Sequence, residues 1–249
     1  MHARFFAPGA YGSGDQIDLP EDEAQHLSRV LRLGVGDAIR IFDGRGREFA
    51  ATIARVTKSA ASVVVEDAQP PRPEPRVAIT LAHAVLKGDK MDDLVRDSVM
   101  LGAAAIQPVV SARTEVTIST LERGNRRERW ARVAVSSAKQ CGRAVVPPVL
   151  APITFDILLA ALGRLELPQP ALMLVEPSAA QAQYGLADLD PRAPREATIA
   201  IGPEGGWTPD EVERGGAVCR LLRFGGLTLR ADAMAVAAIA ALFTRWGEF

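Results

Sequence analysis

The sequence predicts an α/β protein in which a parallel sheet covered by helices follows a smaller β-rich module. Strand-like runs alternate with helical ones in the longer C-terminal part of the 249 residues, and these runs are apolar throughout, as buried parallel strands are. Residues 67–76, "DAQPPRPEPR", hold four prolines and therefore form a stiff linker. The runs before this linker are shorter and alternating, so we expect two domains.

The first domain is expected to span residues 1–70, with the linker at 71–76. "PEDEAQHLSRVLRL", residues 20–33, suits a helix, because Leu27, Val30 and Leu31 recur at helical spacing. The glycines of "DGRGRE" suit a hairpin turn between the first two of three predicted strands. These strands are expected at residues 37–42, 47–56 and 61–67.

The second domain is expected to span residues 77–249, and Met91, Leu94 and Val95 should face its sheet. Residues 178–196 are predicted to be a surface connection with weak helical character. The predicted strands lie at residues 77–85, 104–111, 171–177, 197–202 and 219–225. The predicted helices lie at residues 89–103, 126–141, 208–218 and 231–246.

Composition excludes several classes of protein. The net charge is −1, so any surface that binds nucleic acid must be local. Cys141 and Cys219 belong to no C-x-x-C motif and are expected to be small buried hydrophobes, while His2, His26 and His83 form no ligand cluster, so no metal is expected. The N-terminus lacks the apolar core of a signal peptide and no apolar run reaches the roughly 18 residues of a membrane span, so we expect a cytoplasmic protein without membrane association.

The segment "IGPEGG", residues 201–206, is the strongest candidate for a binding loop. Its three glycines leave the backbone bare after a predicted buried strand, and Thr208 with Glu211 predicts a capping box for the next helix. The pattern is neither a P-loop nor a dinucleotide fingerprint, and Glu204 would repel a phosphate. A nucleoside without phosphates suits the loop better, although a tight turn without any ligand fits the same residues.

Two further strand ends carry unusual residues, at 174–178 and 223–232. The carboxyl ends of parallel strands meet at one edge of a sheet, so both segments are expected beside the glycine loop. Arg230, after an apolar strand and turn, should either be paired inside or face a ligand. Asp232 suits a role beside Arg230 or a simple N-cap of the last helix.

These motifs resemble the SPOUT methyltransferases, and within them the ribosomal RNA small-subunit methyltransferase E family. "IGPEGGWTPDEV" and "FGGLTLRADAMAVAAIAAL" carry the C-terminal similarity, which extends back through "LKGDKMDDLVRDSVMLGAAAIQPVVSART" and "SSAKQCGRAVVPPV". "HLSRVLRLGVGDAIRIFDGRGREFAATI" resembles the family's PUA-like RNA-binding domain, so the likeness covers nearly the whole chain. It implies a SPOUT domain with a deep trefoil knot, a PUA-like β-barrel and a homodimer. It also implies methylation of N3 of a uridine in 16S rRNA of the small ribosomal subunit, with S-adenosylmethionine (AdoMet) as cofactor.

The resemblance also implies roles for individual residues. Arg230 and Asp232 are the expected catalytic residues: the arginine steadies the uracil oxygens, and the aspartate orients it or accepts the proton. The residues expected around AdoMet are Val175, Glu176, Ile201, Gly202, Pro203, Glu204, Gly205, Gly206, Phe224, Gly225, Leu227 and Leu229. The residues expected to contact RNA are His26, Arg29, Arg32, Arg45, Arg47, Lys87, Lys90, Arg126, Gln140 and Arg143.

Cations outnumber acids across residues 113–143, which suits an RNA backbone, although "RRERWAR" also suits a solvated helix face. Trp130 could stack on a base but fits a core position better, because Val133 and Ala134 lie at helical spacing from it.

The chain departs from the family pattern at a few positions. "LRADAM" stands where the family has L-R-T-E-T-A, so Asp232 replaces a glutamate. Asp97 and Lys139 each reverse the family's charge, which suggests a swapped ion pair between them. Two rival functions follow: a non-catalytic RNA-binding or ribosome-assembly protein, or a SPOUT methyltransferase that acts on another rRNA or tRNA nucleotide.

Overall fold

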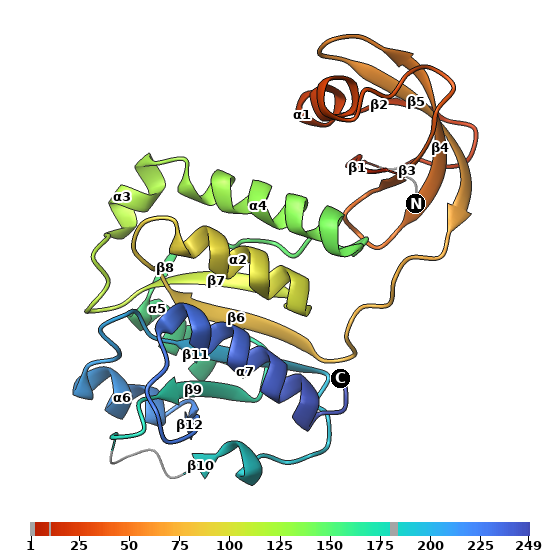
Figure 1. Cartoon of the computed structure of the whole chain (residues 1–249). Coiled ribbons are helices and arrows are strands. Elements are labelled where there is room, and N and C mark those ends of the chain that lie inside the picture. Colours follow the sequence, from red (N-terminus) through yellow and green to blue (C-terminus); the bar gives the residue numbers. More distant parts are fainter. Residues whose placement is uncertain (1–2, 10, 180–183) are drawn as a thin grey trace. The chain divides into compact units, whose positions relative to one another are not determined.

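The structure is a computed structural model that describes residues 3–9, 11–179 and 184–249. The chain forms two compact units, each with its own sheet (Figure 1). The first unit comprises residues 1–74 and 135–146, and the second comprises residues 75–134 and 147–249.

The first unit is built on a five-stranded sheet with the order β1-β3-β4-β5-β2. Its central strands pair antiparallel, and the turn between β3 and β4 is the predicted hairpin. The strands are β1 (Arg4–Phe6), β2 (Gln16–Asp18), β3 (Ala38–Phe42), β4 (Glu48–Val56) and β5 (Ala61–Gln69). The two edge strands, β1 and β2, were not predicted, because three residues are too few to show a period.

The helix predicted at residues 20–33 is shorter than its pattern indicates. It consists of α1 (Glu21–Gln25) followed by the π-helical turn η1 (His26–Val30). Leu27 is buried in the core of this unit, but Val30 is 64% exposed and Leu31 41% exposed. A π-turn holds more residues than an α-turn, so it rotates later side chains away from the apolar face. The predicted apolar face is therefore wrong for Val30 and Leu31.

The second unit is built on a seven-stranded parallel sheet with the order β10-β12-β9-β11-β6-β7-β8. Each of the five predicted strands is present and the parallel arrangement is confirmed. The strands are β6 (Ala78–Ala84), β7 (Ala105–Val110), β8 (Ile153–Thr154), β9 (Ala171–Val175), β10 (Tyr184–Gly185), β11 (Glu196–Ile201) and β12 (Arg220–Arg223).

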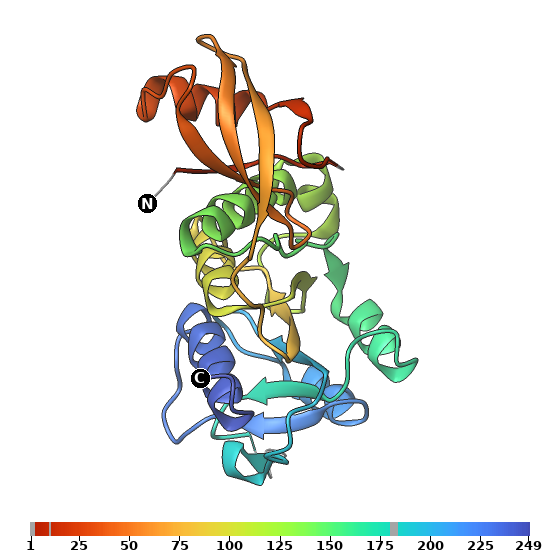
Figure 2. The ribbon, with the colours of Figure 1, turned by 90° about the vertical axis from the view of Figure 1, so that its right-hand side faces the viewer.

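Helices cover both faces of this sheet. Figure 2 shows α2 and α7 on one side of the strands, and α5 and α6 on the other. The helices that lie wholly in this unit are α2 (Lys90–Leu101), α3 (Ile118–Arg123), α5 (Phe155–Gly163), α6 (Pro209–Gly216) and α7 (Ala231–Arg245), and α4 (Arg126–Cys141) has residues in both units. The four predicted helices are confirmed, whereas α3 and α5 were not predicted.

Burial agrees with the predicted core positions. Met91, Leu94 and Val95 are each at most 1% exposed, and Trp130 is 3% exposed, so Trp130 is a core residue rather than a stacking platform. Cys219 is buried, which raises the pKa of its thiol to about 12 and keeps it protonated at neutral pH. Cys141 is only half-buried.

Within residues 178–196, positions 180–183 lie outside the described residues. The described remainder contains β10 and a single 3₁₀ turn, Leu186–Asp188. No described helix is long and apolar enough to cross a membrane.

The predicted ion pair between Asp97 and Lys139 is wrong, because each charge has another partner. The Asp97 carboxylate accepts from the Arg96 guanidinium at 2.8 Å. The Lys139 ammonium donates to both carboxylate oxygens of Glu23 at 2.9 Å. Glu23 is 4% exposed, and burial raises the pKa of its carboxyl, while the hydrogen bond from Lys139 opposes that rise.

Replacing Lys139 with methionine will leave the Glu23 carboxylate buried without its cation. We expect the free energy of unfolding to fall by about 3 kcal/mol near neutral pH. The unpaired carboxyl will have a pKa further above its unfolded value, so the folded protein binds a proton as the pH falls. The deficit should therefore shrink toward about pH 5. Urea unfolding at both pH values measures this, with Lys139→Arg as the charge-preserving control. A deficit that does not change with pH would contradict the assignment.

Candidate functional site

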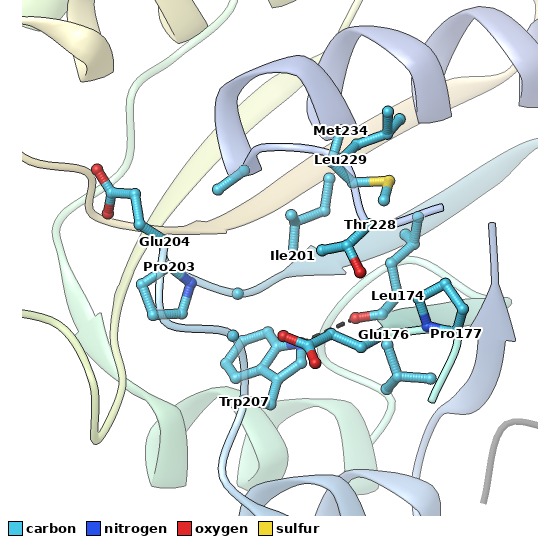
Figure 3. A pocket seen from close by; sticks show the side chains of 14 residues that line it. Leu174, Glu176, Pro177, Ile201, Pro203, Glu204, Trp207, Thr228, Leu229 and Met234 are labelled. Atoms are coloured by element: carbon cyan, nitrogen blue, oxygen red, sulfur yellow. Dashed lines mark hydrogen bonds between the residues drawn. The ribbon is translucent and has the colours of Figure 1, made fainter. Parts of the chain in front are cut away.

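A pocket lies at the carboxyl edge of the parallel sheet, where the segments after β9, β11 and β12 meet (Figure 3). It encloses about 510 Å³, including open solvent at its mouth. The lining residues are Leu174, Val175, Glu176, Pro177, Ile201, Gly202, Pro203, Glu204, Gly206, Trp207, Thr228, Leu229, Ala231 and Met234.

The glycine loop forms a tight turn in which the Gly206 amide donates to the Pro203 carbonyl at 2.9 Å. Gly206 has a φ of +68°, and a Cβ there would lie 2.5 Å from Oε1 of Glu176. A Cβ on Gly202 would lie 3.2 Å from the Trp207 ring. Because these two residues have no side chain, the loop can pack closely against Glu176 and Trp207.

The predicted capping box begins α6 directly after this loop. The Thr208 side chain accepts from the Glu211 amide at 3.2 Å, and the Glu211 carboxylate accepts from the Thr208 amide at 2.9 Å. Glu211 also accepts from the Ala112 amide at 2.8 Å, which ties α6 to the segment after β7. The helix start thus fixes the far end of the glycine loop.

Trp207 forms the floor of the pocket (Figure 3). Its indole N–H donates to the Leu174 carbonyl at 2.9 Å, which joins the loop after β11 to the end of β9. The ring is 8% exposed and stacks obliquely on Phe155, with 5.1 Å between ring centroids. An indole donor that finds a carbonyl can be buried at little cost, so Trp207 both fills space and sets the distance between two loops.

Glu204 connects the glycine loop to residues 87–90 by hydrogen bonds. Its carboxylate accepts from the Lys90 ammonium at 3.0 Å and from the Lys87 amide at 3.3 Å. Partial burial alone would raise the pKa of this carboxyl, but these hydrogen bonds hold the pKa below its usual value. Figure 3 shows the carboxylate pointing away from the other lining side chains. These hydrogen bonds are enough to explain why residue 204 is an acid, so the expected repulsion of phosphates is not needed as a reason.

Arg230 and Asp232 flank Ala231, which lines the pocket. Arg230 is the N-cap residue of α7, so the alternative that Asp232 caps the helix is wrong. The Arg230 side chain is 73% exposed, and its Nε lies 3.6 Å from the Asp232 carboxylate. A loosely paired, exposed guanidinium next to a pocket-lining residue can reach a substrate without first leaving a buried partner.

The structure brings most of the predicted cofactor residues together around the pocket. Those that line it are Val175, Glu176, Ile201, Gly202, Pro203, Glu204, Gly206 and Leu229. Those that do not line it are Gly205, Phe224, Gly225 and Leu227. Gly205 faces the side chain of Arg113, Gly225 lines a neighbouring cavity, and Leu227 is 80% exposed.

The residues that the sequence reasoning missed adjoin the predicted ones in the chain. They are Leu174, Pro177, Trp207, Thr228, Ala231 and Met234. Five of them lie next to a predicted residue, and Met234 lies one helical turn beyond Arg230. Extending each predicted segment by one residue, and by one turn along the helix, would have found them.

The residues predicted to contact RNA fall into two groups, apart from His26. Four of the cations are held by acids: Arg47 by Asp43, Lys87 by Glu115, Lys90 by Glu204 and Arg143 by Glu74. Arg143 is also buried, which makes it a structural residue. His26 is half-buried, and its ring makes a T-shaped contact with the Phe5 ring, with 6.3 Å between the ring centroids. The exposed members are Arg29, Arg32, Arg45, Arg126 and Gln140, and no ion pair involves any of them within the described parts of the chain.

Metal ligands are not clustered in residues 3–9, 11–179 and 184–249. No group of three or more His, Cys, Asp or Glu residues in these ranges could hold an ion. His83 contacts the backbone carbonyls of Ala84 and Ala231, and Asp232 lies beside Arg230.

Family models match both parts of the chain. Residues 72–243 match an RNA methyltransferase domain, and residues 19–66 match an RNA methyltransferase PUA domain. Together with the parallel sheet and the pocket at its carboxyl edge, these matches define an RNA methyltransferase of the SPOUT class with an N-terminal PUA-like domain.

Individual relatives narrow the class. A ribosomal RNA small subunit methyltransferase E from Synechocystis is 32% identical over 79% of this chain and 62% of its own length. The enzyme of that name from Rickettsia conorii is 28% identical over 95% of this chain and 93% of its own length. A crystal structure of the Neisseria gonorrhoeae enzyme of that name, bound to S-adenosyl methionine, superposes with a TM-score of 0.86 at 32% identity. That match covers 99% of this chain and 98% of the other. The chain belongs to the ribosomal RNA small-subunit methyltransferase E family.

Proposed function

We propose that this chain transfers a methyl group from AdoMet to N3 of a uridine in 16S rRNA. The observation that carries the proposal is the likeness, over both domains, to small-subunit methyltransferase E enzymes, one of them with AdoMet bound. The glycine-loop pocket at the sheet edge, with an exposed arginine at its mouth, supports it.

The chemistry of the pocket fits AdoMet. No lysine or arginine lines it among the residues that the structure describes, and AdoMet has no phosphate that would need one. Ile201, Leu229 and Trp207 offer apolar surface for the adenine, and the Glu176 carboxylate suits the positive charges of the ligand. We take the predicted lining residues, together with Trp207 and Thr228, as those that hold the cofactor.

When bound, AdoMet supplies a methyl group on a positively charged sulfur that leaves as a neutral thioether. The protein's part is to position the uracil and to stabilise charge on it. As N3 loses its proton, negative charge spreads onto the uracil oxygens, and Arg230 neutralises it. Asp232, within 3.6 Å of Arg230, orients the guanidinium or accepts the proton.

The target uridine must be unpaired or flipped out to reach the pocket. Residues 1–70 are proposed as the PUA-like RNA-binding domain and residues 77–249 as the catalytic SPOUT domain, joined by the linker at 71–76. The exposed cations Arg29, Arg32 and Arg45 suit the RNA backbone. The enzyme is proposed to act in the cytoplasm, where ribosomal subunits are assembled.

A homodimer is proposed as the working form. The outward face of α7 supports it, because its small apolar residues are only half-buried within one chain; they are Val236, Ala237, Ala240 and Ala241. The trefoil knot implied by the family stays a prediction.

The purified protein should convert uridine to 3-methyluridine in small-subunit RNA or subunits that lack the modification. Nucleoside mass spectrometry after incubation with AdoMet measures the product, and subunits that already carry 3-methyluridine are the control. Methylation at another atom or on tRNA would support the rival methyltransferase. AdoMet binding or RNA binding without any product would support the non-catalytic rival.

Gly206→Ala should weaken AdoMet binding by about tenfold, which corresponds to ~1.4 kcal/mol. The added Cβ would lie 2.5 Å from Oε1 of Glu176 and displace that carboxylate from the pocket wall. Gly36→Ala is the matched control, since Gly36 has a φ of +92° and open space around it. Titration calorimetry should find only the Gly206 variant impaired, and equal affinities would refute the role given to Glu176.

Arg230→Ala should lose turnover by about 100-fold, as expected when a group that stabilises developing charge is removed. AdoMet affinity should stay near the wild-type value, because Arg230 does not line the pocket. Arg223→Ala, which removes an exposed arginine from the end of β12, should keep its turnover. Steady-state kinetics and calorimetry test both variants, and a large loss of AdoMet binding in Arg230→Ala would assign that residue to the cofactor instead.

A further inference from the structure

Residues 224–234 supply much of the proposed site but make few hydrogen bonds to the rest of the domain. The segment supplies Arg230 and Asp232, and it supplies part of the pocket wall through Thr228, Leu229 and Ala231. Residues 225–230 are exposed, and α7 begins without any side-chain cap. Burial of Ala235, Ala238, Ile239, Leu242 and Phe243 holds the later turns of α7, whereas Ala231 is the one buried residue of its first turn.

One side-chain hydrogen bond joins this segment to another element, within the described residues. It comes from His83, near the end of β6, whose Nε2 lies 3.1 Å from the carbonyl oxygen of Ala231. The contact joins positions that are 148 residues apart in the chain. Because Ala231 lies between Arg230 and Asp232, the contact acts directly on the backbone that presents both side chains.

His83 is fully buried, beside Ile201 of the glycine-loop strand. Its Nδ1 lies 2.7 Å from the carbonyl oxygen of the next residue, Ala84. Burial lowers the pKa of the imidazole, while these two carbonyls and the charges of Glu204 and Asp232 oppose that change. A neutral ring has a single N–H, so the two carbonyls compete for it. Only the bond to Ala231 reaches beyond the histidine's own strand.

We infer that His83 carries its proton on Nε2 and is a positioning residue, which holds the first turn of α7 through the Ala231 carbonyl and so sets the places of Arg230 and Asp232. The inference rests on the proposed function of those two residues. A buried hydrogen bond between a sheet and a helix start can hold backbone to within the small tolerance that group transfer requires. A misplacement of ~1 Å costs about 100-fold in rate.

Three substitutions at position 83 separate this role from simple packing. His83→Gln places an amide donor near the position of Nε2 and can reach Ala231. His83→Asn places its donor near the position of Nδ1 and can reach only Ala84. His83→Met fills the space without a strong donor. Thr198→Val is the matched control, because it removes another buried hydrogen bond of the same sheet, from Thr198 to the Pro168 carbonyl at 2.8 Å.

Each variant is measured for turnover to 3-methyluridine, AdoMet dissociation constant and thermal unfolding. We expect turnover to fall about 10- to 100-fold in the Asn and Met variants, with AdoMet affinity within about threefold of wild type. The Gln variant should keep turnover within about threefold of wild type. Thr198→Val should lower the unfolding temperature without lowering turnover.

Wild-type turnover in His83→Met or His83→Asn would overturn the inference, as would a Gln variant no better than the Met variant. Parallel losses of turnover, AdoMet affinity and stability in all three variants would mean that His83 serves only the fold. If His83→Met does not fold, the turnover of His83→Gln compared with that of His83→Asn still tests the inference. A wild-type protein that binds AdoMet but forms no 3-methyluridine refutes the proposed function and this inference together. An active wild type with unaffected variants refutes the inference alone.

Discussion

The parallel pairing of β6, β11, β9 and β12 is the constraint on which the rest of the site depends. These strands are neighbours in one sheet, and all of them run in the same direction, so the chain leaves each of them at the same edge. The register sets Ile201 beside His83 and Arg223 beside Val175. A slip of one residue in any pair would turn the side chains of that strand to the opposite face of the sheet and shift its carboxyl end along its neighbour. The position of the pocket is therefore set by the pairing of the strands, and individual side chains then shape it.

Strand pairing brings the loops to one edge, but polar contacts set the distances between them. Trp207 joins the loop after β11 to β9, Glu204 joins it to the segment after β6, and His83 joins β6 to the start of α7. Each of these side chains bonds to a group of another segment of the protein. The loop is bare at Gly202 and Gly206 because Trp207 and Glu176 approach so closely there. A pocket wall built in this way is formed before any ligand binds, which lowers the cost of binding.

Local pattern predicted much of this structure, because strands that are apolar throughout and helices with an apolar face are visible within a short window. The capping box at Thr208 and the glycine loop were visible for the same reason. The contacts between distant residues were not. Glu204 and Lys90 are 114 positions apart, and nothing in either segment indicates the other. The prediction of an ion pair between Asp97 and Lys139 was wrong because opposite charge alone does not identify a partner. Asp97 pairs with Arg96 and Lys139 pairs with Glu23. The short strands β8 and β10 exist only because a longer neighbour pairs with them.

The pairing of the cations changes how the proposed RNA face should be understood. Lys87, Lys90 and Arg47 already have acidic partners, so a phosphate that binds them must displace a carboxylate and not only a counterion. That exchange contributes little net affinity, because one ion pair replaces another. Arg29, Arg32 and Arg45 have no such partner among the described residues, and they would supply most of the salt-sensitive attraction. On the proposed RNA contacts, the first unit would supply most of the affinity for the RNA. Lys87 and Lys90 would favour only RNA that is placed accurately enough to replace their carboxylates, so they would contribute to positional specificity more than to binding energy.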